Sequence, residues 1–411
     1  MRNIYKYSFI LGLVLLIPSI LFLSFKLENK PSTSKNPDEY IASYIEGEYQ
    51  TAIPGKDDGY VVDKIVCDNG ATGTWNNEEW GIDIRNATQK VKCSIYFVKA
   101  TIADQIAALA AKDTTNFATD DPDNNIRYIG AEPNNYVYFN CSDYSNQNDS
   151  TCEKWRIIGV FGDSVKIIRN DSIGAYSFDV SDNGSGSVMW EESKLMKLLN
   201  DGYEAESIGG SLYYNSTSGK CYSYDENSRK NVEIECDFSS IGLKNDETRD
   251  AIQRKRWELG EFDDGIKFGE AQKVKSPELV YSYEMGKNNT SSNWWYGEIG
   301  LMYLSDYGYA TAGGSTTERI SCLKTDLSSW KNLTDCYKNN YLYNSNDSQY
   351  TLTHATISGM LGLHENGGLS LPVPYYPQEI RPSLFLDPDI SILQGDGSSS
   401  NPYQLKLYEY N

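Results

Sequence analysis

The sequence predicts an α+β protein with three parts: an N-terminal transmembrane helix, a small β-domain and a large second domain. Three observations carry this prediction. A charge-free apolar run lies near the start, short segments of alternating hydrophobicity follow between Gly and Asn residues, and helical periodicity recurs in the longer second half. The 411 residues of the chain allow two or three domains.

The apolar run covers residues 8–25 and is interrupted only by small polar residues and Pro18. Its length is close to the roughly 20 residues that span a bilayer. Arg2 and Lys6 precede it, which favours a cytoplasmic N-terminus and a single-pass protein of the cell membrane with extracellular domains. A cleaved signal peptide is the alternative, although no A-x-A-like cleavage site follows the run. Both alternatives export the remainder of the chain.

The eight cysteines agree with export, because disulfides persist outside the cytoplasm. They fall into four neighbouring pairs: Cys67 and Cys93, Cys141 and Cys152, Cys221 and Cys236, Cys322 and Cys336. Four local disulfides are the simplest connectivity, and other connectivities stay open. The chain has two histidines and no C-x-x-C motif, so no metal site is predicted.

Composition narrows the classes of partner. The net charge of −20 argues against nucleic acid, whose binding depends on basic patches, and against adsorption to anionic lipid. Tyrosine is abundant, with 32 residues against 12 phenylalanines. Tyrosine combines apolar area with a polar tip, which suits binding surfaces.

Changes in composition divide the chain into six segments. They are residues 1–30 (membrane anchor and flanks), 31–39 (linker), 40–99 (small β-domain), 100–119 (helical spacer), 120–388 (large domain) and 389–411 (C-terminal β tail). Within the large domain, residues 190–200 and 246–259 are predicted as helices, and the arginines and lysine of the second are assigned to a solvated face.

Four segments of the large domain carry a resemblance to known proteins: Arg127–Gly130, Trp155–Phe161, Asp306–Thr311 and Ile380–Leu386. Together they resemble uncharacterised bacterial surface proteins. The C-terminal domain of that group resembles the C-type-lectin-like fold shared with formylglycine-generating enzymes. The resemblance implies a C-type-lectin-like domain over residues 120–388. The cysteine-framed unit before it resembles small β-domains, Ig-like ones among them, that precede such regions.

The resemblance transfers no functional residue. Formylglycine-generating enzymes hold copper with a closely placed cysteine pair, and Cys322 and Cys336 lack the surrounding motif. Calcium-type lectins use a Glu-Pro-Asn triplet near a Trp-Asn-Asp strand; Glu132–Asn134 has the triplet, but Trp-Asn-Asp does not occur. No nucleotide-binding fingerprint or nucleophile elbow occurs either, so we predict no catalytic residue and no cofactor.

Aromatic clusters are the candidate ligand-binding residues, because exposed rings stack on sugars or anchor protein contacts. We expect the site between about residues 297 and 377, just upstream of the last strand of the large domain. The candidates are Trp294, Trp295, Tyr375 and Tyr376, followed by Tyr307 and Tyr343.

The sequence therefore predicts a membrane-anchored extracellular binding or adhesion protein without catalytic activity, which contacts a glycan or a protein at the cell surface. One alternative is an exported carbohydrate-directed hydrolase that uses paired carboxylates. Another is a structural protein of the cell envelope.

Overall fold

The computed structural model describes residues 39–56, 58–180, 186–225, 227, 230–260, 275–287, 293–346, 348–355 and 359–407. The chain divides into two compact units, residues 1–100 and 101–411. The predicted membrane anchor at residues 1–30 lies outside the described residues. No helix within the described ranges is both long enough and apolar enough to cross a bilayer.

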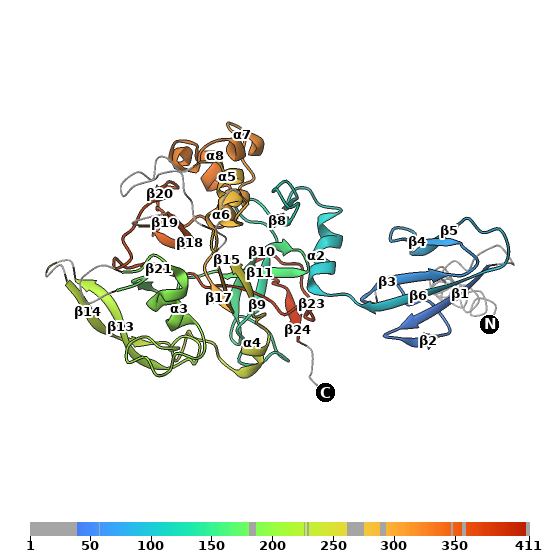
Figure 1. The fold of residues 1–411 in the computed structure, drawn as a ribbon, viewed down its shortest axis with the longest axis horizontal. Helices are drawn as coiled ribbons and strands as arrows, with labels where there is room; N and C mark the ends of the chain where they lie inside the picture. Colours follow the sequence, from blue (N-terminus) through green and yellow to red (C-terminus); the bar gives the residue numbers. More distant parts are fainter. Residues whose placement is uncertain are drawn as a thin grey trace, which may run out of the picture. The chain divides into compact units, whose positions relative to one another are not determined.

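The first unit consists of strands. They are β1 (Glu39–Ile45), β2 (Glu48–Gln50), β3 (Tyr60–Cys67), β4 (Thr72–Asn76), β5 (Gly81–Arg85) and β6 (Val91–Lys99). A four-stranded sheet has the order β2-β1-β6-β3, with β1 and β6 parallel, and β4 and β5 form a separate hairpin (Figure 1).

The β4–β5 hairpin covers one face of this sheet. Trp75 of β4 packs edge-on against Phe97 of β6, with ring centroids 5.4 Å apart. A Cβ atom at Gly73 would lie 2.7 Å from the Ile65 side chain, so only glycine permits this close approach. On the same face, Cys67 and Cys93 are directly paired across β3 and β6 and form a disulfide.

The second unit is also built mainly from strands. They are β7 (Phe117–Ala118), β8 (Ile126–Tyr128), β9 (Tyr136–Phe139), β10 (Glu153–Phe161), β11 (Ser164–Arg169), β12 (Ala175–Tyr176), β13 (Ser218–Asp225), β14 (Lys230–Asp237), β15 (Lys255–Glu258), β16 (Trp294–Gly297), β17 (Ile299–Gly300), β18 (Gln349–Ala355), β19 (Gly359–Leu363), β20 (Leu369–Ser370), β21 (Gln378–Glu379), β22 (Ser383–Phe385), β23 (Ser391–Gln394) and β24 (Gln404–Lys406).

Its helices are short. They are α2 (Ile102–Ala110), η1 (Trp190–Glu192), α3 (Lys194–Leu199), α4 (Asp246–Asp250), α5 (Pro277–Glu284), α6 (Leu304–Tyr309), α7 (Arg319–Lys324), η3 (Leu327–Asn332) and α8 (Thr334–Lys338). A capping box between Thr101 and Asp104 begins α2, whose residues Ile102, Ala103 and Ile106 are buried.

The central sheet of the second unit has the order β17-β22-β11-β10-β8-β7, with β9 also paired to β10. Every residue of β11 is buried, because β10 and β22 flank it and side chains cover both of its faces. A second sheet has the order β12-β21-β18-β19-β20, and three separate two-stranded sheets are β13–β14, β15–β16 and β23–β24.

The predicted α+β class with a C-type-lectin-like domain is wrong. Strands predominate, and the mixed sheets do not clearly match a lectin fold. The first unit likewise has one mixed sheet and a hairpin rather than the two packed antiparallel sheets of an Ig-like domain. One cause lies at residues 246–259. The helix there ends at Asp250, because the following residues form β15 and pair with β16.

The structure confirms the prediction of disulfides. The bonds are Cys67–Cys93, Cys141–Cys152, Cys221–Cys236 and Cys322–Cys336. Each bond joins neighbours in sequence and closes a short loop, which restricts the unfolded chain.

Candidate functional site

The strongest candidate surface is the outer face of the two-stranded β15–β16 sheet. Side chains of a strand alternate between its two faces. Trp294 and Tyr296 of β16 therefore point the same way, and they are 52% and 53% exposed. Trp295 points to the opposite face, where its ring lies 5.9 Å from that of buried Trp190.

Arginines of the neighbouring chain segment complete this face. Arg256 is paired with Tyr296 in the register, and its guanidinium carbon lies 5.2 Å from the centre of the Trp294 ring. The guanidinium carbon of Arg254 lies 5.7 Å from the centre of the Tyr296 ring. Glu258 forms an ion pair with Arg256, with Arg256 Nε and Glu258 Oε1 2.6 Å apart. The face thus presents two rings, two cations and one carboxylate.

The side chains on the inner face of the β15–β16 sheet pack against the core. Trp257 is fully buried, donates from its indole nitrogen to the Gly297 carbonyl at 3.2 Å, and packs 4.9 Å from the Phe385 ring. Because Trp257 is directly opposite Trp295 in the register, both inward rings anchor the two strands to the core. The outer rings consequently stand on a fixed backbone.

A second aromatic group lies at the β13–β14 hairpin. The ring of Tyr224 is 5.1 Å from that of Tyr375 and 6.0 Å from that of Tyr376. Tyr376 is 38% exposed, and Tyr375 is half-buried. Two hydrogen bonds hold the backbone of Tyr375 and Tyr376. Ser177 Oγ donates to the Tyr375 carbonyl at 2.7 Å, and the Tyr350 hydroxyl donates to the Tyr376 carbonyl at 2.6 Å.

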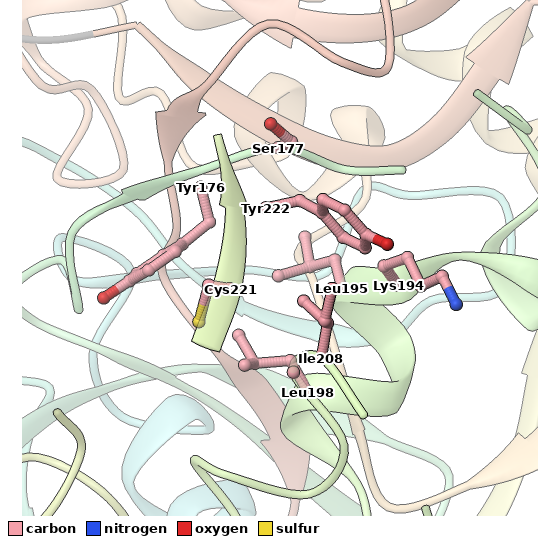
Figure 2. Close-up of a pocket in the computed structure, with 9 residues that line it drawn as sticks. Tyr176, Ser177, Lys194, Leu195, Leu198, Ile208, Cys221 and Tyr222 are labelled. Atoms are coloured by element: carbon pink, nitrogen blue, oxygen red, sulfur yellow. The ribbon is translucent and has the colours of Figure 1, made fainter. Parts of the chain in front are cut away.

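A small hollow lies beside this group, between β12, α3 and β13 (Figure 2). It is lined by Tyr176, Ser177, Lys194, Leu195, Leu198, Ile208, Gly209, Cys221 and Tyr222. Its volume is about 270 Å³ with the open space at its mouth included. The space that the centre of a water-sized group can occupy is only about 20 Å³, which is far too small for a small-molecule ligand. None of the lining residues is a carboxylate, so the hollow does not supply the pair that a glycoside hydrolase needs.

The remaining two candidates lie elsewhere. Tyr307 is fully buried, donates to the Gly367 carbonyl at 3.2 Å and packs on Trp330, so it belongs to the core and does not meet a ligand. Tyr343 is half-buried and donates to the Glu365 carbonyl. The structure therefore distributes the six predicted aromatic residues over separate places, and only part of them is exposed.

The structure also shows a buried network of charges that the sequence did not reveal. Arg127 of β8 binds Asp121 at 2.8 Å and Asp306 at 2.6 Å, and Lys166 of β11 binds the other oxygen of Asp306 at 2.6 Å. All four residues are at most 3% exposed. Burial would raise the pKa of Asp306, but the charges of Lys166 and Arg127 outweigh burial and hold the pKa below its ordinary value.

Glu284 of α5 lies beside this network and differs from Asp306. Burial raises its pKa from 4.5 to about 7, although the Thr353 hydroxyl and the Ser305 N–H both donate to its carboxylate. Two carboxyl groups with separated pKa values are a pattern typical of acid–base catalysis. Here both are 1% exposed. Their burial leaves a substrate no access, so Asp306 and Glu284 do not form an exposed acid–base pair.

The acidic cluster at residues 120–123 has partners of its own. Asp120 pairs with Arg319 at 2.7 Å, Asp121 with Arg127, and Asp123 with Lys287. No group of three or more potential metal ligands occurs in the part of the chain that the structure describes. A second acidic segment of the sequence, residues 261–265, lies outside the described residues.

Comparisons with known proteins give no information about this site. No protein family, curated protein or solved structure matches the chain. None of these comparisons bears on the resemblance to bacterial surface proteins.

The sequence analysis names Trp294 as a candidate but not Tyr296, Arg254 and Arg256, which lie on the same face. The signal was present in the alternation of Trp294 with Tyr296 and of Arg254 with Arg256. It was missed because residues 246–259 were assigned to one helix, which distributes the same arginines around an axis.

Proposed function

We propose that the chain is an exported, non-catalytic binding protein that contacts a glycan through the outer face of β15–β16. One observation carries the proposal: Trp294 and Tyr296 are exposed on a strand whose inward ring, Trp295, packs against buried Trp190. Exposed aromatic residues on a rigid backbone contribute contact area at a small entropic cost.

The polar groups of the same face support a glycan as the ligand. Arg254, Arg256 and Glu258 offer donors and acceptors at the edges of the rings. A sugar has an apolar face for stacking and hydroxyl groups at its rim, which this arrangement complements. The four disulfides support export.

The alternative of a hydrolase has weaker support. The paired carboxylates with separated pKa values, Asp306 and Glu284, are buried, and the hollow near α3 has no carboxylate in its lining. A protein ligand at the β16 face would use the same rings and is distinguished by experiment.

A glycan array probed with the purified full-length chain tests the proposal. We expect binding to a restricted set of glycans, and we expect Trp294→Ala/Tyr296→Ala to abolish it. Ile320→Ala is the matched control, because Ile320 of α7 is a 62% exposed apolar residue away from this face. Equal signals from the wild type and the double variant would refute the proposal.

A further inference from the structure

The first unit has a second exposed aromatic face, on the side of its sheet opposite the β4–β5 hairpin. We define this tyrosine face by the outward side chains of β2, β1, β6 and β3. They are Tyr49, Tyr40, Tyr44, Lys92, Tyr96 and Lys64.

The register places these side chains together. Tyr44 is opposite Tyr49 on one side and opposite Tyr96 on the other, and Tyr96 is opposite Lys64. The Tyr44 ring stacks on the Tyr96 ring at 4.8 Å and meets the Tyr49 ring edge-on at 5.8 Å. A continuous row of rings therefore crosses three strands.

The row is open to solvent. Tyr40 and Tyr49 are 52% and 54% exposed, and their hydroxyl oxygens lie 3.3 Å apart. The apolar side chains of Val66 and Val98, also exposed, belong to the same face. Contiguous exposed apolar surface of this kind is typical of interaction sites.

Two lysine amines lie over the rings of this face. The Lys64 amine lies 4.8 Å from the centre of the Tyr96 ring, and the Lys92 amine lies 5.8 Å from the centre of the Tyr40 ring. Asp63 lies at the bulge of β3 next to Lys64, and the Asp68 carboxylate accepts a hydrogen bond from the Lys92 N–H at 2.7 Å. In a chain of net charge −20, the two lysine amines held against the rings favour an anionic ligand.

We infer that the tyrosine face binds an acidic polysaccharide, a polymer of sugar rings that carry carboxylate groups. The rings are spread in a row over three strands, which suits an extended polymer better than a single anchor residue of a protein, since protein hot spots sit in packed pockets. Tyrosine hydroxyls and lysine amines can donate to carboxylates and sugar hydroxyls. This surface belongs to the first unit and the β16 face to the second, so the inference does not depend on the site proposed at β16.

Binding of the full-length chain to immobilised polygalacturonate tests the inference. We expect binding that weakens as salt is added, because exposed charges are screened. Methyl-esterified polygalacturonate keeps the sugar and loses the charge, whereas poly-L-glutamate keeps the charge and loses the sugar. We expect neither to bind. Equal binding of poly-L-glutamate would overturn the inference, because the face would then recognise charge alone.

Two variants locate the contact. Lys64→Gln/Lys92→Gln and Tyr40→Ala/Tyr49→Ala should each weaken binding roughly tenfold or more, as loss of anchor residues does. Arg85→Gln is the matched control, since Arg85 is exposed on the hairpin that covers the opposite face, and it should change affinity less than about twofold.

Two other outcomes contradict the inference. Loss of binding in Trp294→Ala/Tyr296→Ala with retention in both tyrosine-face variants would move the polysaccharide to β16. Self-association of the wild type that Lys64→Gln/Lys92→Gln abolishes, without polysaccharide binding, would assign the face to contact between copies. Unfolding curves that coincide for the variants and the wild type show that lost binding is not lost folding.

Discussion

Cations lie over aromatic rings in two contrasting settings in this protein. In the second unit, the Lys166 amine lies 4.1 Å from the centre of the Tyr303 ring, and the Arg127 guanidinium carbon lies 4.3 Å from the centre of the Phe161 ring; both cations are buried in the core. On β15–β16, Arg256 lies over the exposed ring of Trp294.

Burial decides what the same pair of groups does. The buried cations are held by Asp306 and Asp121, so their charge is already matched inside the protein. The exposed arginines and rings keep surfaces that a ligand can reach. Residue type alone therefore does not identify a site, and substitutions in the two settings should have different effects.

The largest effect is expected from Asp306→Asn. This change leaves Arg127 and Lys166 short of an anion inside the core, and breaking a buried pair typically costs about 3–5 kcal/mol. Urea unfolding measures the loss. Glu233→Gln is the control, because its ion pair with Lys220 is exposed and its removal should not shift the midpoint. Similar midpoints for both variants would mean that the buried network does not stabilise the fold.

The next effect concerns the disulfide between Cys322 and Cys336. The two cysteines are 14 positions apart, and closing a loop of this size contributes about 3 kcal/mol by restricting the unfolded chain. Cys322→Ala/Cys336→Ala should therefore lower the free energy of unfolding by this amount. A variant that unfolds with the wild type would show that the bond adds no stability.

A smaller effect is expected from Glu284 as the pH changes. Its folded pKa of about 7 lies above 4.5, so its contribution to stability is present below pH 4.5 and is lost as the pH rises through 7. Between pH 5 and 7.5 the wild type should lose about 2 kcal/mol more than Glu284→Gln, which cannot ionise. Parallel stability curves for the two proteins would place the folded pKa of Glu284 near its ordinary value.

The smallest effect on folding is expected at the exposed ring. Trp294→Ala should lower the free energy of unfolding by less than about 1 kcal/mol, since half of the side chain is already in water. Trp257→Ala, on the paired strand, should cost about 3–5 kcal/mol because its ring is fully buried. Equal losses of unfolding free energy in the two variants would show that the outer and inner faces of the β15–β16 sheet do not differ in burial.

Part of this structure could be predicted from the sequence. The disulfides follow from local spacing, and strands such as β3, β6, β10 and β11 follow from their apolar and β-branched residues. The fold class could not be predicted, because the pattern at residues 246–259 fits a helix until pairing with β16 makes its second half a strand.

The sites show the same limit. Trp294 and Trp295 are adjacent in sequence and were treated as one cluster, but the alternation of a strand sends them to opposite faces. The buried network was beyond sequence reasoning, because Arg127 and Asp306 are 179 positions apart and only the fold brings them together. Tyr307 shows that an abundant residue is as readily core as surface.

The central claim is that the exposed rings of β16, and not the buried aromatic residues, meet the ligand. Hydroxyl-radical footprinting of the full-length chain tests it directly, with and without the glycan that binds best on the array. The account predicts that oxidation of Trp294 and Tyr296 falls when the glycan is present, while that of Ile320 is unchanged. Undiminished oxidation of Trp294 and Tyr296 in the saturated complex would contradict it.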